Sequence, residues 1–191
     1  MNVHINNTVR SCCFQLRATA KIRKYVSYSS IIKLCHAFIT SRLDKLNSLL
    51  VNISNCMLHK LQLVQNSTAR VILKLSRQSN ITPALIVLHW LPFPERIHCN
   101  ILLLVYKSIN HQGLSYLADM LTPYQPSRAH RSSLQHFLNK KKTNKKYWER
   151  AFAGCGPALC NNLPLFIRQS ESVEIFKSNL KTFLFKPEFQ L

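Results

Sequence analysis

The chain has 191 residues, 47% of them hydrophobic, which excludes a disordered polypeptide and suffices for the core of one domain, with or without a small appendage. Its 26 Lys and Arg against 7 Asp and Glu give a net charge of +19, which favours nucleic acid as a partner, with anionic membrane surfaces and ribosomal surroundings as alternatives. With 3 glycines, the chain has fewer than strand-rich folds and nucleotide-binding loops usually need in their turns, so helices are favoured.

The first half of the chain has the spacing of amphipathic helices. Residues 3–20 place on one helical face Ile5, Val9, Cys12 and Leu16. Serines that can act as N-caps precede the next apolar series, which contains Ile31, Cys35, Phe38, Leu43, Leu46 and Leu50. Ser54 and Asn55 can cap a further helix, with an apolar stripe of Leu58, Leu61, Val64, Val71, Ile72 and Leu75. The basic residues that fall mostly off that stripe are Lys60, Arg70 and Lys74.

Prolines divide the middle of the chain. The stretch "SNITPALIVLHWLP" predicts a turn, a short helix that starts near Pro83, and a stop at Pro92. Pro94 suits the first turn of a new helix, whose broad apolar stripe extends to Ile109 and predicts the most buried helix. Gly113 is expected to end it nearby, and "LSYLADML" predicts one more short helix.

Residues 122–150 interrupt this pattern. They hold eight Lys and Arg and one Glu, show little periodicity, and predict an exposed basic loop or linker. Beyond them, a short helix at 157–162 and a last helix over "ESVEIFKSNLKTFLF" are predicted. The expected fold class is therefore mainly α, an irregular bundle of amphipathic helices. Its expected parts are a helical domain at 1–121, the basic loop at 122–150, and a small helical C-terminal segment at 151–191.

The stretch "HWLPFPER" raises the question of a catalytic histidine. His89 would need a carboxylate to orient it or a nucleophile beside it. The one local acid, Glu95, suits the first turn of the following helix instead. A Trp90 packed between two helices is the better interpretation, so the stretch is predicted to be a joint between helices.

The cysteines do not have the spacing of a metal site. Seven cysteines without a Cys-x-x-Cys pair, in a chain without an export signal, predict reduced and buried thiols. His98 and Cys99 are adjacent and point to different helix faces, and Cys155 and Cys160 have no second pair to complete four zinc ligands. Neither a metal nor a cofactor is expected.

Carboxylates are scarce. Polymerase or nuclease chemistry needs clustered carboxylates to hold two divalent ions, and Glu171 and Glu174, at a helix start, are the one close pair. The sequence also has no glycine-rich phosphate loop and no Gly-x-Ser-x-Gly elbow. No catalytic residue is therefore predicted, and the chain alone is not expected to be an enzyme.

The run "NKKKTNKKYWER" is the strongest functional feature. Its lysines can contact phosphates and its two aromatic residues can stack on bases, without sequence specificity, because phosphate contacts carry no base information. The alternatives are a solvated loop and a basic run of the nuclear-import kind. The candidate nucleic-acid-binding residues are Lys140, Lys141, Lys142, Lys145, Lys146, Tyr147, Trp148, Arg128 and Arg131.

Several segments together carry a resemblance. They are "SRLDKLNSLL", "LHKLQLVQNSTARVIL", "ITPALIVLHWLPFPERIHCNILLLVYKSIN", "SYLADMLTPYQPSRAHRSS" and "ERAFAGCGPALCNNLP", followed by "ESVEIFKSNLKTFLF". The chain resembles, over nearly its whole length, the C-terminal part of the reverse transcriptase of non-LTR retrotransposons, the LINE elements of the jockey-like and chicken-repeat-like kind. The family usually has Trp where Cys160 stands and Gly where Trp148 stands.

The resemblance implies a helical thumb region and the segment after it. In such polymerases the thumb grips the template–primer duplex through its backbone. The Asp-Asp motif of the palm has no counterpart here, so no catalytic residue is carried over. The chain is expected to be a non-catalytic fragment that binds RNA or DNA non-specifically. The alternatives are a helical protein-interaction module, with a palm domain or another helical protein as partner, and a translated transposon remnant without a selected function.

The expected location is intracellular, in the nucleus or the cytoplasm. The N-terminal residues lack the basic start and apolar block of a secretory signal. The longest apolar run, residues 101–106, is far too short to cross a bilayer, so no membrane partner is expected.

Overall fold

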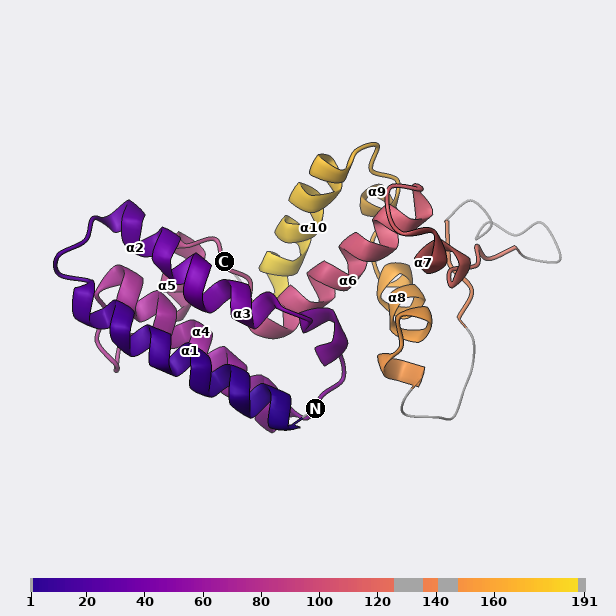
Figure 1. Ribbon diagram of the computed structural model, residues 1–191. Helices are drawn as coiled ribbons and strands as arrows, with labels where there is room; N and C mark the ends of the chain where they lie inside the picture. The colour runs from indigo at the N-terminus through magenta and orange to yellow at the C-terminus, as the bar shows by residue number, and fades with distance from the viewer. Residues whose placement is uncertain (1, 126–135, 141–147, 189–191) are drawn as a thin grey trace. The chain divides into compact units, whose positions relative to one another are not determined.

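The computed structural model describes residues 2–125, 136–140 and 148–188. In these residues the chain is all helical, apart from one isolated antiparallel bridge between Pro123 and Leu138, which confirms the prediction of a mainly α fold (Figure 1). The chain divides into two compact units. The N-terminal unit contains Met1–Asn47 and Ile53–Pro94, and the C-terminal unit contains Ser48–Asn52 and Glu95–Leu191.

The N-terminal unit is built on two long helices. Helices α1 (Asn2–Ile22) and α4 (Asn55–Leu73) pack side by side, as Figure 1 shows. The shorter elements are α2 (Tyr28–Cys35), a π-helical turn (His36–Thr40), α3 (Ser41–Asp44) and α5 (Thr82–Val87). The core collects apolar side chains from these helices, among them Ile5, Cys12, Ile31, Cys35, Ile39, Leu43, Leu61, Val64, Ala69 and Ile72. A core built from one stripe of each helix is what the periodicity predicts.

The π-helical turn His36–Thr40 changes which residues are buried. Phe38 and Leu46 were expected in the core but are 44% and 53% exposed, while Ile39 is fully buried. A π-helical turn contains more than 3.6 residues, so the apolar face after Cys35 moves by one position. Leu46 lies beyond the end of α3 with a φ of 61°, outside any helical stripe.

The caps of the N-terminal unit are partly those expected. Ser27 is the N-cap of α2, and its hydroxyl accepts a hydrogen bond of 3.2 Å from the backbone N–H of Ser30. Ser54 occupies the N-cap position of α4, but its side chain makes no capping hydrogen bond. Ser54 contributes to the start of α4 through its backbone oxygen, which accepts from the N–H groups of Met57 at 2.9 Å and Leu58 at 3.1 Å.

The "HWLPFPER" stretch begins as a joint after α5. The helix closes in a Schellman motif, in which the N–H of His89 bonds to Ile86 O and the N–H of Trp90 bonds to Leu85 O, both at 2.9 Å. His89 takes the left-handed conformation, with a φ of 52°. Trp90 is buried and meets the imidazole of His36 edge-on, with ring centroids 5.8 Å apart. Trp90 therefore has a packing role, as the sequence indicated.

The C-terminal unit gathers shorter helices around most of α6 (Phe93–Ile109). They are α7 (Ser115–Asp119), α8 (Phe152–Asn161), α9 (Leu165–Arg168) and α10 (Val173–Glu188). Helix α8 starts five residues before the predicted 157–162. It lies close to α6 at Gly156, where an added Cβ would be 2.9 Å from the side chain of Val105. The end of α6 is formed by His111, at a φ of 54°, rather than by Gly113.

Part of the segment 122–150 is packed rather than exposed. Leu138 is 5% exposed, although an exposed loop was expected there. The side-chain amide of Asn161 makes two hydrogen bonds of 2.9 Å to the backbone of Leu138. Its Oδ1 accepts from the Leu138 N–H, and its Nδ2 donates to the Leu138 carbonyl oxygen. Leu138 lies in the isolated bridge with Pro123, and the amide of Asn161 satisfies the backbone N–H and carbonyl of this buried residue.

Candidate nucleic-acid interface

Most of the residues predicted to bind nucleic acid lie outside the described part of the chain. Lys140 is described and exposed, and Trp148 begins a short 3-10 helix that ends at Arg150. The candidates outside the described residues are Arg128, Arg131, Lys141, Lys142, Lys145, Lys146 and Tyr147. Their role in binding remains a prediction from the sequence.

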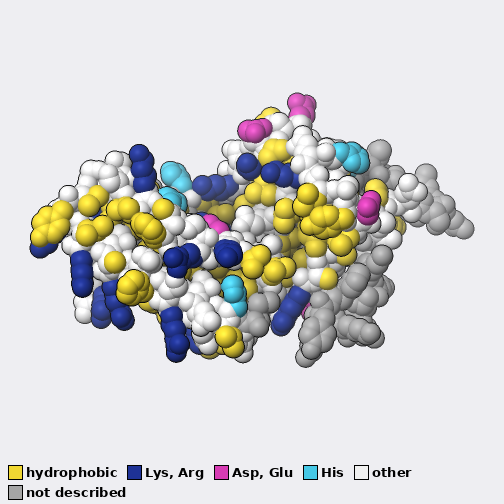
Figure 2. Space-filling view, viewed as in Figure 1, with side chains coloured by type: hydrophobic (Ala, Val, Ile, Leu, Met, Phe, Trp, Pro, Cys, Tyr) yellow, Lys and Arg dark blue, Asp and Glu magenta, His cyan; other side chains and the backbone are white. Residues whose placement is uncertain are grey.

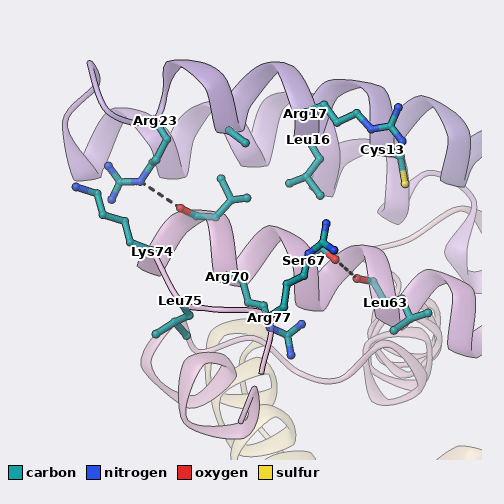
Figure 3. Close-up of a pocket in the computed structure, with 12 residues that line it drawn as sticks. Cys13, Leu16, Arg17, Arg23, Leu63, Ser67, Arg70, Lys74, Leu75 and Arg77 are labelled. Carbon is teal, nitrogen blue, oxygen red and sulfur yellow. Dashed lines mark hydrogen bonds between the residues drawn. The ribbon is translucent and has the colours of Figure 1, made fainter. Parts of the chain in front are cut away.

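The structure shows a different basic site, a groove between α1 and α4 (Figure 3). It has a volume of about 890 Å³. Its cationic residues are Arg17, Arg23, Arg70, Lys74 and Arg77. Its other lining residues are Cys13, Leu16, Ala20, Leu63, Ser67, Val71 and Leu75. We call these residues together the basic groove.

Arg23 joins the two helices that form the groove. It follows α1, and its guanidinium donates to the backbone oxygen of Val71 at 3.2 Å (Figure 3). It also donates to the backbone oxygen of Ile72 at 3.0 Å. These oxygens lie in the last turn of α4, where carbonyls lack helical partners and the helix dipole is negative. Arg23 therefore stabilises the end of α4 while it lines the groove.

The cations of α4 are also held in place by its C-terminal geometry. Lys74 has a φ of 56°, and the N–H of Leu75 bonds to Arg70 O at 3.0 Å, which closes the helix. Arg70 donates to Ser79 O at 3.3 Å, but its buried Nε atom has no hydrogen-bond partner. After the turn at Lys74 the chain stays beside the groove, so that Leu75 and Arg77 also line it.

The charge around the groove is of one sign. None of the described residues that line it is acidic. The sequence of the N-terminal unit contains twelve Lys and Arg but a single acid, Asp44. Figure 2 shows Lys and Arg side chains spread over the surface of this unit, with hydrophobic side chains between them. Such a surface attracts polyanions, and a concave site concentrates its potential.

A second, more open hollow adjoins the basic groove. It shares Ala20, Arg23 and Lys74 with the groove and adds Lys21, Lys24 and Tyr25. Tyr25 is 77% exposed, and the ammonium of Lys24 lies 4.8 Å from the centroid of its ring. An aromatic ring in a cationic setting suits ligands that carry both phosphates and flat rings.

The sequence contained only a partial signal for this groove. In the sequence, Arg70 and Lys74 lie mostly off the apolar stripe of their helix, but the basic run 140–146 is the stronger local signal for binding. The spacing of Arg17 and Lys21, and of Arg70 and Lys74, places each pair on one helix face. The spacing within each helix does not show that the two helices pack against each other.

The described residues do not bring metal ligands together. No three of their His, Cys, Asp and Glu side chains form a cluster. The seven cysteines are all described, and none is paired. Burial raises the pKa of Cys12, Cys35 and Cys160 to about 11, so these thiols stay protonated near neutral pH.

Cys160 borders a hollow in the C-terminal unit. This hollow has a volume of about 440 Å³ and is also lined by Tyr106, Phe137 and Phe176. The rings of Tyr106 and Phe176 stack with centroids 4.2 Å apart, and the guanidinium of Arg168 lies 4.5 Å from the Phe137 centroid. Polar residues, among them Asn110 and Gln169, also line this hollow.

Comparison with family models, curated proteins and solved structures gives no match to the chain. Among its described residues, no helix is both long enough and apolar enough to span a membrane.

Proposed function

We propose that the protein binds nucleic acid through its sugar–phosphate backbone, and that the basic groove is a principal contact. The observation that carries this proposal is a concave site with five cationic side chains and no acidic one among its described lining residues. Phosphate oxygens are the natural ligands of such guanidinium and ammonium groups. Backbone contacts of this kind give affinity without sequence specificity.

The resemblance supports a fuller proposal about origin. The chain is the non-catalytic C-terminal part of a LINE-type reverse transcriptase, and it keeps the backbone-binding property of a thumb region. Its helical fold agrees with this origin. So does the scarcity of carboxylates, since seven Asp and Glu scattered along the sequence do not form a two-metal site.

A charge-matched pair of variants tests the groove. Arg17→Gln with Arg77→Gln removes two exposed cations that line the groove. Lys33→Gln with Lys45→Gln removes two exposed cations of the same unit outside the groove. Affinity for a labelled single-stranded RNA is measured at several salt concentrations. The groove variant should bind more weakly and lower the slope of log K against log salt by about 0.7 for each lost phosphate contact.

The control variant in the same titration should keep an affinity and a salt slope closer to those of the unmodified protein. Equal losses in the two variants would show that net charge alone acts, and would contradict a groove-based site. A third variant, with Lys140, Lys141, Lys142, Lys145 and Lys146 replaced by Ala, tests the basic run. Weaker binding and a flatter salt dependence in that variant would assign the run as a second contact.

A further inference from the structure

We propose that the basic groove and the hollow that adjoins it take single-stranded rather than duplex nucleic acid, with a base stacked on Tyr25 in the hollow. This inference rests on the proposed function and specifies the ligand of that same site. It depends on the apolar surface that accompanies the charges, whereas the proposed function depends on the charges alone.

The groove combines cations with exposed apolar side chains. Leu63 and Leu75 line it and are 48% and 37% exposed, and Leu16 and Val71 contribute further apolar surface. In a duplex the bases are stacked on each other and only phosphates and sugars face a groove of this kind. In a single strand the base faces are free to contact apolar side chains while phosphates meet the cations. The mixed lining of the groove therefore fits a single strand better.

Tyr25 is placed to stack on a base. A turn at the end of α1, closed by the N–H of Tyr25 bonding to Ile22 O at 2.9 Å, holds the residue beside the adjoining hollow. Lys24 lies over one face of the ring, and with 77% of the residue exposed the opposite face is accessible. Lys21 and Lys74 line the same hollow and are exposed, so phosphates on either side of the stacked base would meet cations.

An anionic membrane also offers negative charge and apolar groups, but its surface fits this site less well. A bilayer contacts side chains that project from a convex face. The apolar residues of this site line a concave groove between two packed helices, and cationic side chains lie around them. A flexible strand can enter such a groove, and a lipid surface cannot follow it.

The experiment measures binding of a labelled oligouridylate of about 12 nucleotides, and of a GC-rich RNA duplex of similar length, to the full chain. The unmodified protein should bind the single strand more tightly. Tyr25→Ala should weaken single-strand binding about tenfold with an unchanged salt slope, because stacking releases no counterions. Tyr25→Phe should retain most of the affinity. Tyr116→Ala, which removes a ring that is 55% exposed in the C-terminal unit, is the matched control and should have no effect.

The outcomes separate the two proposals. Equal affinity for strand and duplex, together with no effect of Tyr25→Ala, would overturn the single-strand inference. The proposed function would still stand if the Arg17 and Arg77 variant weakened binding to both. Phosphatidylserine vesicles that bind as tightly as the oligouridylate, and compete with it, would overturn the inference in favour of a membrane surface.

Discussion

Gln65 and Leu91 are joined by a hydrogen bond of 2.7 Å, in which the side-chain amide of Gln65 donates to the backbone oxygen of Leu91. Gln65 is 1% exposed, on the core face of α4. One helical turn earlier, the side-chain oxygen of Gln62 accepts from the N–H of Phe93, also at 2.7 Å. These two amides bind the backbone of the "HWLPFPER" stretch on both sides of Pro92, which has no N–H to donate to a helical hydrogen bond.

Replacing Gln65 with Ala should therefore lower the free energy of unfolding by about 2–4 kcal/mol, because it leaves a buried carbonyl unpaired and opens a cavity. Urea denaturation followed by circular dichroism measures the change. Gln78→Ala, at an exposed position, is the control and should change stability by less than about 0.5 kcal/mol. A loss of similar size in both variants would contradict a specific role for the Gln65 amide.

In the described part of the chain, Lys74, His89 and His111 follow the ends of α4, α5 and α6 in the left-handed conformation, although none of them is glycine. This conformation costs a residue with a Cβ roughly 1–2 kcal/mol, and glycine adopts it without that strain. His89→Gly and His111→Gly should each raise the free energy of unfolding by about 1 kcal/mol, measured by thermal melting. The same substitution at His59, within α4, should lower it by about 1 kcal/mol. A decrease at all three positions would contradict strain at the helix ends.

The cysteines should differ sharply in reactivity. Cys56 is exposed and Cys13 partly exposed, whereas Cys12 and Cys35 are buried with a pKa of about 11. Because the thiolate is the reactive form, brief treatment with a maleimide at neutral pH should label Cys56 first and Cys13 next. Mass spectrometry of peptides locates the label, and urea should make all seven thiols reactive. Early labelling of Cys35 would contradict the packing of the N-terminal unit.

Cys160 borders the hollow of about 440 Å³ in the C-terminal unit, which Tyr106 and Phe176 also line. Cys160→Trp should raise the free energy of unfolding by about 1–3 kcal/mol, since the indole would bury apolar surface there. Cys56→Trp adds the same indole at an exposed position and should give no such gain. Lower stability in the Cys160 variant, measured by urea denaturation, would show that the hollow does not admit the ring.

Burial lowers the pKa of His98 below its ordinary value of 6.5. The unfolded chain therefore takes up a proton at this residue at a higher pH than the folded protein does. The stability linked to His98 is fully present above pH 6.5 and is lost as the pH falls below that value. His98→Gln should flatten the fall in melting temperature over this range, whereas His59→Gln, at an exposed position, should leave it unchanged. Identical profiles for both variants would rule out this contribution of His98.

Much of the fold was predictable, because long helices with one apolar stripe carry a strong periodic signal. The cores of α1, α4 and α10 follow that signal, as Ile5, Val64 and Leu180 show. The prediction was wrong for Phe38, because a π-helical turn shifts the stripe and leaves no mark in the spacing. It was wrong for the end of α6, because histidine at 111 takes a conformation for which glycine is the usual signal.

The candidate site was less predictable than the fold. A run of lysines is visible as a string of letters, but the basic groove exists only because two helices far apart in the sequence pack together. The periodicity of each helix tells which of its faces is apolar. Which helices are partners, and which basic residues then lie across from each other, depends on tertiary packing that no local pattern records.

The division of the basic groove between residues 13–23 and 63–77 has a thermodynamic consequence. An unfolded chain does not hold these two stretches together, so a ligand that spans them has no comparable site to occupy before folding. Occupancy is then coupled to the folding equilibrium, and saturating ligand at a hundred times its dissociation constant would add about 2.7 kcal/mol to the stability of the N-terminal unit. Because the bound ligand would connect the two stretches, its binding would raise the melting temperature of the N-terminal unit.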